Sequence, residues 1–379
     1  MADIKTHLRE LSVATTIGLL KNNINYSLQD LYDSNKFFTF ASQVITGNIS
    51  SAKNLCTTPF FTGELKQIVD NGHRLGKAIF TNAHFQINAT DIITWQGNDT
   101  QKDDPVDITV GKYGFSLKEE SFILENMGLY KLLNCYTGSS YTKRHIFSDY
   151  ARPEYEAWFD ATWKELLSVL NTNGGTWSYD NTIKQKKGII TLSNSTVKLE
   201  YFKSGKSEAS AKLPEKCSLS EFESNTSSKT REEVFAKFIN QTLDNNANYN
   251  IAKKACAVAA SNNLAKELNA NLNYNAGLPR FIRKHTSEYY YAKTTVSGIE
   301  IFRVPDINSF GNDIVIESIV GSVPDKQANI LTTIKNTKTG KKLVLRNECR
   351  FSHGQFNGTP EAKMYYEHGG SLLVIYDEI

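Results

Sequence analysis

The residues best suited to chemistry in this 379-residue sequence lie close together, between positions 103 and 120. Asp107 stands at the start of one short apolar run and Lys118 at the end of the next, with Gly111 and Lys112 between the two runs. Runs joined by so tight a connection predict an antiparallel β-hairpin. Because the turn closes one end of the hairpin, Asp107 and Lys118 should meet at the open end. Ser116 lies two residues before Lys118 and should share its face of the strand.

A carboxylate beside an ammonium group suits the hydrolysis of a phosphodiester bond. In such reactions carboxylates hold Mg²⁺, the metal activates water, and a lysine orients the nucleophile or offsets the phosphate charge. We therefore expect Mg²⁺ as cofactor, bound by Asp107 and a glutamate, with Lys118 positioning the attacking water. The structural alternative is an edge hairpin on which Asp107 and Lys118 form a surface ion pair worth about 0–1 kcal/mol.

The same residues resemble the PD-(D/E)XK nuclease superfamily, which includes many type II restriction endonucleases. The resemblance lies in Pro105 and Asp107 at one strand start and in Ser116-Leu117-Lys118 at the end of the next strand. A preceding helix carries Glu64, and the first helix of the family often supplies a glutamate. Residues 64–134 are covered. The resemblance implies a restriction-endonuclease-like mixed sheet flanked by helices, sequence-specific Mg²⁺-dependent cleavage of double-stranded DNA, a homodimer, and a cognate DNA methyltransferase as functional partner.

One position departs from the family pattern. The family usually has Asp or Glu two residues before the lysine, where this sequence has Ser116. A hydroxyl is a poor Mg²⁺ ligand. The resemblance implies that a glutamate from elsewhere replaces this acid. The candidates are Glu120, which is in phase with Lys118 if the strand continues, and Glu125 on the following helix. We favour Glu120, so the predicted metal ligands are Asp107, Glu120 and Glu64.

A polar segment near the C-terminus combines side chains that read bases in the major groove. Arginine pairs with guanine, and asparagine or glutamine pairs with adenine. We therefore predict a DNA-recognition surface made of Arg346, Asn347, Arg350, His353, Gln355 and Asn357. A polar β-surface whose side chains bond one another is the alternative.

The same region contains a competing catalytic motif. Glu361-Ala362-Lys363 is a literal Glu-x-Lys triplet, and Glu348 lies upstream of it. Pro360 indicates a loop directly before the triplet, and no helix is expected after it. The hairpin at Asp107 is therefore the favoured centre, and the triplet stays as an alternative.

The elements expected around these sites indicate a mixed α/β chain. Helical periodicity extends over much of the first 60 residues and then over 63–71, 121–133, 154–170, 231–243 and 251–268. Strand-like runs lie at 78–80, 92–95, 106–110, 113–117, 188–192, 196–202, 293–304, 314–319, 330–336, 341–351, 363–366 and 372–376. The polar segment 204–228 predicts a linker. We expect a nuclease core with N-terminal helices over 1–203, and a helical segment plus a β-rich DNA-recognition module over 204–379.

Composition limits the classes of function. A net charge of +3 and a pI near 8.4 argue against a strong overall positive field, so any contact with DNA must be local. Five widely spaced cysteines predict free, buried thiols. No segment reaches the ~18 apolar residues of a membrane helix, and no signal segment is present, so we expect a cytoplasmic protein without membrane contact. The main alternative to an endonuclease is a non-catalytic DNA-binding or regulatory protein with a degenerate nuclease core.

Overall fold

The computed structural model describes residues 4–56, 58–97, 106–119, 123–138, 145–273, 288–295, 298–305, 313–367 and 372–379, with the backbone alone for 119 and 123–127. The helices are α1 (Ile4–Lys21), α2 (Leu28–Tyr32), α3 (Ser34–Val44), α4 (Ile49–Ala52), η1 (Lys53–Leu55), α5 (Gly63–Thr81), α6 (Leu129–Thr137), α7 (Ile146–Tyr150), α8 (Arg152–Thr172), α9 (Leu219–Asn225), α10 (Ser228–Thr230), η2 (Arg231–Phe235), α11 (Ala236–Thr242), α12 (Ala247–Ala270) and η3 (Leu372–Val374). The strands are β1 (Thr46–Gly47), β2 (Ile93–Trp95), β3 (Ile108–Val110), β4 (Tyr113–Glu119), β5 (Ile123–Gly128), β6 (Thr176–Asn181), β7 (Lys186–Ser193), β8 (Thr196–Lys203), β9 (Lys206–Pro214), β10 (Tyr289–Thr295), β11 (Gly298–Val304), β12 (Ile314–Ser322), β13 (Ala328–Asn336), β14 (Lys342–Arg350), β15 (Glu361–Tyr366) and β16 (Asp377–Glu378).

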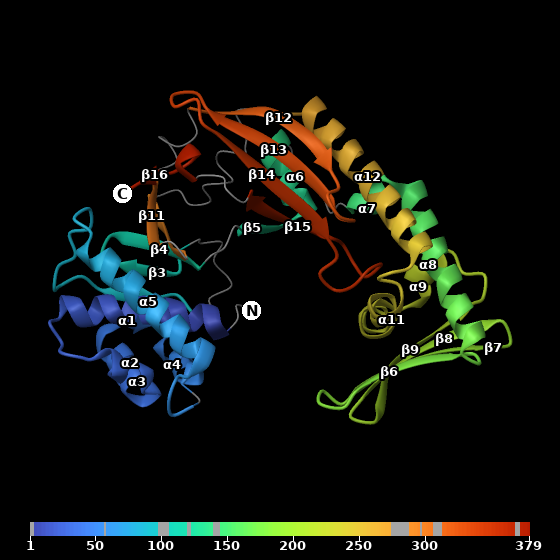
Figure 1. Ribbon diagram of the computed structural model, residues 1–379, viewed down its shortest axis with the longest axis horizontal. Helices are drawn as coiled ribbons and strands as arrows, with labels where there is room; N and C mark the ends of the chain where they lie inside the picture. The colour runs from blue at the N-terminus through green and yellow to red at the C-terminus, as the bar shows by residue number, and fades with distance from the viewer. Residues whose placement is uncertain are drawn as a thin grey trace.

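The described chain is a mixed α/β structure with three sheets. A mixed sheet of seven strands has the order β1-β2-β3-β4-β10-β11-β16, and two antiparallel sheets have the orders β12-β13-β14-β15-β5 and β6-β7-β8-β9. The sheets follow an arc in Figure 1. The seven-stranded sheet with α1 to α5 lies at one end, the five-stranded sheet with α12 lies in the middle, and the four-stranded sheet lies at the other end.

The seven-stranded sheet combines strands from distant parts of the sequence. β2, β3 and β4 form an antiparallel meander, and β10 then pairs with β4 in parallel. β11 and β16 follow β10 in antiparallel order. After the Asp107 hairpin, the sheet is therefore completed by residues 289–304 and 377–378, and not by the strand pair at 188–202.

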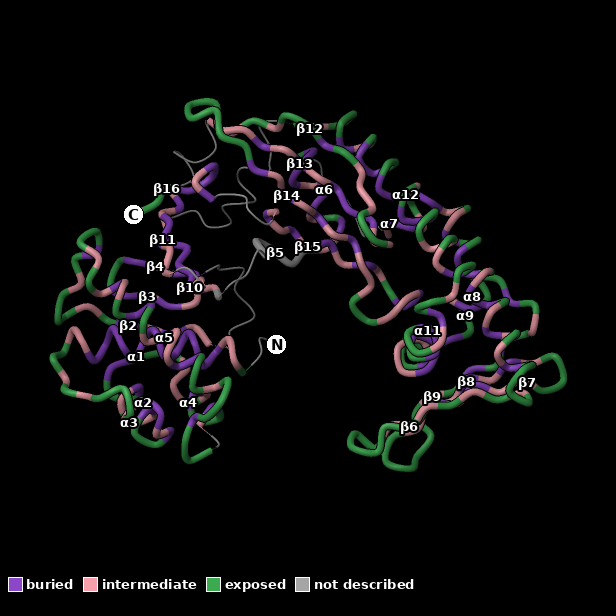
Figure 2. Tube along the Cα trace, viewed as in Figure 1, coloured by how far each residue is buried: buried purple, intermediate pink, exposed green. Residues whose placement is uncertain are grey.

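Helices α1 and α5 cover one face of this sheet and pack unusually closely against each other. A Cβ atom added at Gly72 would lie 2.6 Å from Cβ of Ser12, and one added at Gly76 would lie 2.8 Å from the main-chain oxygen of Val13. Any larger residue would push the helices apart, so these glycines fix the position of α1. Figure 2 shows α1 as a largely buried helix, and its residues 7–19 are all buried.

The opposite face of the sheet joins a second and larger core. Tyr289, Tyr291, Phe302 and Val304 from β10 and β11 pack there with the C-terminal residues 372–376. The same core continues beneath the five-stranded sheet and the helices α7, α8 and α12. The two cores thus lie on the two faces of the seven-stranded sheet.

Most of the elements predicted from periodicity are present. The helices predicted at 154–170 and 251–268 correspond to α8 and α12, and the strands predicted at 188–192 and 196–202 correspond to β7 and β8. The tight connection at Gly111 joins Val110 to Tyr113 directly in register, and Gly111 has the positive φ of +55° that such a turn requires.

Four predicted elements were wrong. The segment 78–80 is the last part of α5, which continues through Gly72 because that glycine packs against α1. Residues 123–128 form β5 before the helix α6 begins. Residues 372–374 form the short helix η3 and not a strand. The polar segment 204–228, predicted as a linker, contains β9 and α9, because β9 is the edge strand of a sheet and needs only one apolar face.

The predicted domain boundary at 203/204 lies inside the four-stranded sheet. Lys203 and Lys206 are paired across the β8–β9 turn. Within the described residues, no helix is both long and apolar enough to cross a membrane. All five thiols are free and four of them are buried, as the sequence predicts.

Candidate active site

The β3–β4 hairpin brings Asp107 and Lys118 together at its open end. The Nζ atom of Lys118 lies 3.5 Å from Oδ2 of Asp107. Both side chains are partly exposed, at 24% for Asp107 and 29% for Lys118, so the pair can be reached from outside. The contact that hairpin geometry predicts is therefore present.

The main chain holds the Asp107 carboxylate in one orientation. Its Oδ2 atom accepts a hydrogen bond of 2.6 Å from the main-chain N–H of Leu117. The main-chain N–H of Asp107 donates to the oxygen of Phe115 at 2.8 Å, and its own oxygen accepts from the N–H of Gln96 at 3.1 Å. Asp107 is thus fixed between β2 and β4, and its second oxygen remains for another ligand.

Ser116 and Lys118 share one face of β4, as their spacing predicts. Ser116 is buried at 4% exposure. In the parallel pairing of β4 with β10, Lys118 lies opposite Lys293, whose Nζ contacts Glu300 at 2.8 Å and the hydroxyl of Tyr366 at 3.0 Å. Lys293 is thus mostly buried and pairs with Glu300, whereas Lys118 is 29% exposed and pairs with Asp107.

A second carboxylate at this site comes from Glu10 on α1. Glu10 is buried at 4% exposure, and its Oε2 atom accepts a hydrogen bond of 3.1 Å from the indole N–H of Trp95 on β2. It is near enough to Asp107 and Lys118 for both charges to act on its pKa. The close packing of α1 on α5 keeps this helix, and hence Glu10, against the sheet.

Burial and the neighbouring charge together change the protonation of Glu10. Desolvation is the larger cause and repulsion from Asp107 the second, and they raise the pKa of Glu10 from 4.5 to about 8. The Trp95 hydrogen bond and the charges of Lys118 and Arg9 act in the opposite direction. In the absence of a cation, Glu10 is therefore mainly protonated at neutral pH.

This donor set fits a divalent cation. Carboxylate oxygens are the ligands that Mg²⁺ prefers, and a nearby cation stabilises the charged form of a carboxylate. Glu10 and Asp107 are the two carboxylates concerned, and no cluster of three or more carboxylate, histidine or thiol groups occurs among the described residues.

Of the glutamates predicted from the sequence, only Glu64 lies fully within the described residues, and it lies away from the hairpin. Glu64 begins α5, where its exposed carboxylate pairs with Lys5 at 2.5 Å, and it does not appear among the charges that act on Glu10. Glu120, the side chain of Glu125, and Pro105 lie outside the described residues.

Glu10 had a recognisable signal in the sequence. Between Arg9–Glu10 and Lys21 the helix has no charged residue at all. A helix without a polar face is covered on all sides, so a charged residue within it must be buried. A buried carboxylate needs a partner or a cation, which is the property expected of a site residue.

Two of the six predicted DNA-recognition residues are buried. Asn347 is fully buried, and its amide nitrogen donates to the hydroxyl of Tyr136 at 3.3 Å. Asn357 is 5% exposed; its Oδ1 accepts from the Ser228 hydroxyl at 3.2 Å, and its Nδ2 donates to the oxygen of His353 at 2.9 Å. These two side chains hold protein segments together and cannot reach a base edge, which corrects the prediction.

The other four recognition candidates are accessible to different degrees. Arg346 is bonded to Glu367 at 2.9 Å and to Glu348 at 2.8 Å, so its guanidinium is already neutralised. Arg350 contacts Glu348 at 3.5 Å, and His353 lies 3.6 Å from Glu232 with 67% of its side chain exposed. Gln355 donates to Asn240 at 3.2 Å. Arg350 and Gln355 also line a cavity, described below.

The alternative triplet Glu361-Ala362-Lys363 lies on β15. Ala362 is buried, while Glu361 and Lys363 are half-buried. Lys363 is paired with Glu348 in the β14–β15 register, but that carboxylate is bonded to Arg346 and Arg350. With Glu348 neutralised, the triplet lacks the pair of available carboxylates that the Asp107 site has.

Comparison with models of known protein families, with curated proteins and with solved structures gave no match. What the site can do therefore follows from its own residues.

Proposed function

We propose that this protein is a Mg²⁺-dependent, sequence-specific endonuclease of double-stranded DNA, of the type II restriction enzyme kind. The observation that carries the proposal is the contact of Asp107 with Lys118 at the open end of one hairpin, with the buried Glu10 of α1 near enough for the charges of both residues to act on its pKa. Two carboxylates and an ammonium group form the set that metal-assisted phosphodiester hydrolysis requires.

The sheet supports a restriction-endonuclease-like core. The helices α1 and α5 precede the β2-β3-β4 meander, and β10 then joins β4 in parallel. The PD-(D/E)XK family has a comparable order of helix, strands, helix and strand. The helix expected between β4 and β10 would come from the long segment that contains α6 to α12.

Glu10 and Asp107 are the residues that would hold Mg²⁺. When bound, the metal supplies Lewis acidity to the phosphate and lowers the pKa of a water ligand. This pair takes over the role of the acid that the family pattern has at the position of Ser116. The buried hydroxyl of Ser116 keeps space on the Lys118 face without adding a further negative charge.

Lys118 acts on the phosphate and on the nucleophile. Its ammonium group can donate hydrogen bonds to a non-bridging phosphate oxygen or to the attacking water, and its charge offsets that of the phosphate. Asp107, held by the Leu117 N–H, keeps the Nζ atom of Lys118 at 3.5 Å. The hairpin thus fixes the position of Asp107 relative to Lys118, which supports the proposed role of this pair.

A restriction function also implies partners. Cutting both strands of a palindromic site requires two active sites related by a twofold axis, so we propose a homodimer. A cognate DNA methyltransferase would protect the DNA of the host.

Cleavage of phage DNA tests the proposal directly. Unmethylated phage DNA is incubated with the protein in Mg²⁺ or in EDTA and then separated on a gel. Discrete fragments in Mg²⁺ alone are expected. Intact DNA that is nevertheless retained in a gel-shift assay would instead identify a non-catalytic DNA-binding protein, and a smear would indicate a non-specific nuclease.

Matched variants locate the active site. Lys118→Ala should reduce cleavage at least about 100-fold, whereas Lys112→Ala, at the turn end of the same hairpin, should cut like the wild type. Glu10→Gln should likewise abolish cleavage, and Glu64→Gln should not. Wild-type rates for Lys118→Ala would refute the assignment, and a loss of activity in Glu64→Gln with full activity in Glu10→Gln would return the metal site to α5.

A further inference from the structure

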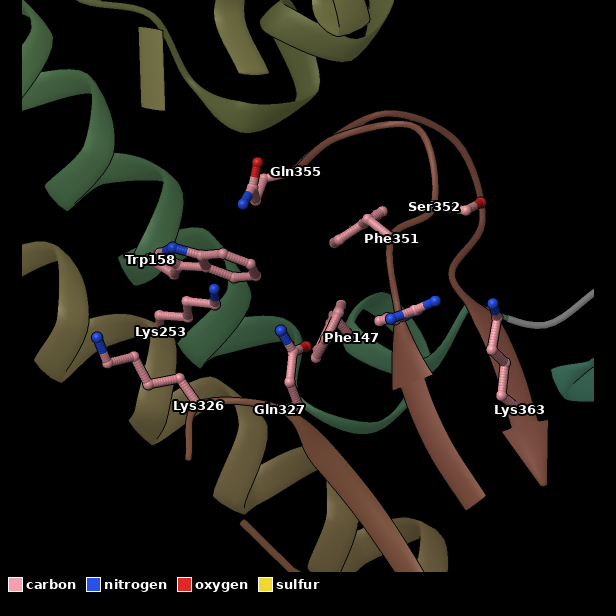
Figure 3. A pocket seen from close by; sticks show the side chains of 10 residues that line it. Phe147, Trp158, Lys253, Lys326, Gln327, Phe351, Ser352, Gln355 and Lys363 are labelled. Carbon is pink, nitrogen blue, oxygen red and sulfur yellow. The ribbon is translucent and has the colours of Figure 1, made fainter. Parts of the chain in front are cut away.

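A second candidate site lies away from Asp107, in a cavity of about 530 Å³. Figure 3 shows that side chains from α7, α8, α12, the start of β13, the end of β14, the 351–357 loop and β15 surround it. This volume is in the range of small-molecule pockets. The cavity lies in the part of the chain that includes Arg350 and Gln355.

Positive charge dominates the wall of this cavity. Lys253, Lys326, Arg350 and Lys363 line it, and no carboxylate is among its described lining residues. Arg350 has Glu348 at 3.5 Å, whereas none of the three lysines forms an ion pair with a described carboxylate. Burial is the larger cause and repulsion from Lys326 the second, and they lower the pKa of Lys253 against the opposing charge of Asp244. An anion in the cavity would remove this repulsion.

Aromatic rings form the rest of the wall. Phe147 lies 5.7 Å from Trp158 and 5.4 Å from Phe351, measured between ring centroids, and all three line the cavity. The two phenylalanine rings offer no hydrogen-bond donor to a bare inorganic anion. Flat aromatic ligands, in contrast, stack on them, and nucleic-acid bases do so irrespective of sequence.

Two amide side chains also line the cavity. Gln327 and Gln355 line the cavity together with the rings, and in Figure 3 the Gln327 amide points into the space between Lys253 and Phe147. An amide both donates and accepts hydrogen bonds, which is how glutamine recognises the edge of a base. Cations, rings and amides together match a ligand with a phosphate, a flat base and a polar base edge.

We propose that this cavity binds one nucleotide, with its base against Phe351 and its phosphate beside Lys253 and Lys326. The source we expect rests on the proposed endonuclease function: a nucleotide turned out of the bound DNA duplex. A base paired within a duplex could not enter, so extrusion would be required. A free nucleoside monophosphate has the same chemistry and is the other source.

The test uses the full-length protein in EDTA, so that cleavage does not interfere. Fluorescence anisotropy gives the dissociation constants of two labelled 30-base-pair duplexes, one fully paired and one with a central mismatch. A mismatched base is turned out at lower cost, so the wild type should bind the mismatched duplex about fivefold more tightly or better. Calorimetric titration with the four deoxynucleoside monophosphates detects binding of the free nucleotide.

Two variants and one control assign either result to the cavity. Phe351→Leu keeps apolar packing but removes the ring, and Lys326→Ala removes one half-buried ammonium group. Each should reduce the mismatch preference, or the monophosphate affinity, about fivefold or more. Lys341→Ala, on the exposed β13–β14 turn, should change neither.

The outcomes distinguish an extruded DNA nucleotide from a free nucleotide as the ligand, and they test the cavity separately from the endonuclease function. Mismatch preference without monophosphate binding identifies extruded DNA as the source, and monophosphate binding without mismatch preference identifies the free nucleotide. Absence of both, or either signal unchanged in both variants, would overturn the proposal. Since all measurements are made in EDTA, a protein that binds here but does not cut DNA would contradict only the endonuclease function.

Discussion

The protonation of Glu10 leads to a quantitative prediction about stability. Folding raises the pKa of Glu10 from 4.5 to about 8, first because the carboxyl is buried and then because Asp107 repels its charged form. Between these two pH values the folded protein therefore binds more protons at Glu10 than the unfolded chain does. Stability that depends on this group must fall as pH rises through that window, and it becomes constant above about pH 8.

The magnitude follows from the same two pKa values. At about 1.4 kcal/mol for each pH unit, the complete window amounts to about 5 kcal/mol, of which about 4 kcal/mol lies between pH 5 and pH 9. The substitution Glu10→Gln removes the titration but keeps an oxygen that can accept the Trp95 N–H. The variant should therefore gain about 4 kcal/mol in the free energy of unfolding relative to the wild type when pH is raised from 5 to 9.

Urea denaturation in EDTA, followed by tryptophan fluorescence at both pH values, measures this difference. Glu64→Gln is the matched control, because its carboxylate is exposed and paired with Lys5, and it should follow the wild type. Addition of Mg²⁺ at pH 8 should then stabilise the wild type and not Glu10→Gln, by about 1.4 kcal/mol at a metal concentration of ten times Kd. Identical pH dependence in the wild type and Glu10→Gln would show that Glu10 is not buried beside Asp107.

Three further substitutions test other parts of the structure. Gly76→Ala should lower the free energy of unfolding by about 1–3 kcal/mol, because the new Cβ would lie 2.8 Å from the main-chain oxygen of Val13. If thermal denaturation is unchanged from the wild type, α1 and α5 are less closely packed than described. Gly111→Ala should lower the free energy of unfolding by about 1–3 kcal/mol, since it forces alanine into a φ of +55°, and it should slow DNA cleavage by displacing the hairpin. Cleavage at the wild-type rate would show that the turn does not affect the active site. Asn347→Ala should lower the free energy of unfolding by about 1–3 kcal/mol through loss of its hydrogen bond to Tyr136. Its DNA affinity, measured by fluorescence anisotropy, should be unchanged. A loss of DNA affinity without a loss of stability would show that Asn347 does contact DNA.

Strand and turn patterns in the sequence correctly predicted the contact between Asp107 and Lys118, which lie in one hairpin. Asp107 and Lys118 are joined by one tight turn, so strand periodicity and turn chemistry are enough to bring them together. Glu10 belongs to the same site but is far from the hairpin in sequence. Its position depends on how α1 packs on α5 through Gly72 and Gly76, and no local pattern contains this information.

Residue type alone was a poor guide to which side chains could contact DNA, because it does not show which of them are buried. Asn347 and Asn357 have the chemistry of base-reading residues, yet both are used to join segments of the protein. Alternation along β14 places Asn347 on the buried side and Arg346 on the other, which the strand period alone could have shown. The lysines of the cavity were not predicted, because α12 and the start of β13 meet β14 only in the folded chain.

The path of the chain connects the two candidate sites. β4, which carries Lys118, ends at Glu119, and β5 begins at Ile123 as the edge strand of the five-stranded sheet. The neighbour of β5 in that sheet is β15, on which Lys363 lines the cavity and pairs with Asn126. One strand pair and one short connection therefore separate the cavity wall from the strand of the catalytic lysine. On β10, Lys293 lies opposite Lys118 and donates a hydrogen bond of 3.0 Å to the hydroxyl of Tyr366 on β15, so a side-chain contact also joins the two sheets beside Lys118. A nucleotide held in the cavity would thus be bound to the same framework that holds Lys118, so binding there would constrain where the rest of the DNA meets the carboxylates.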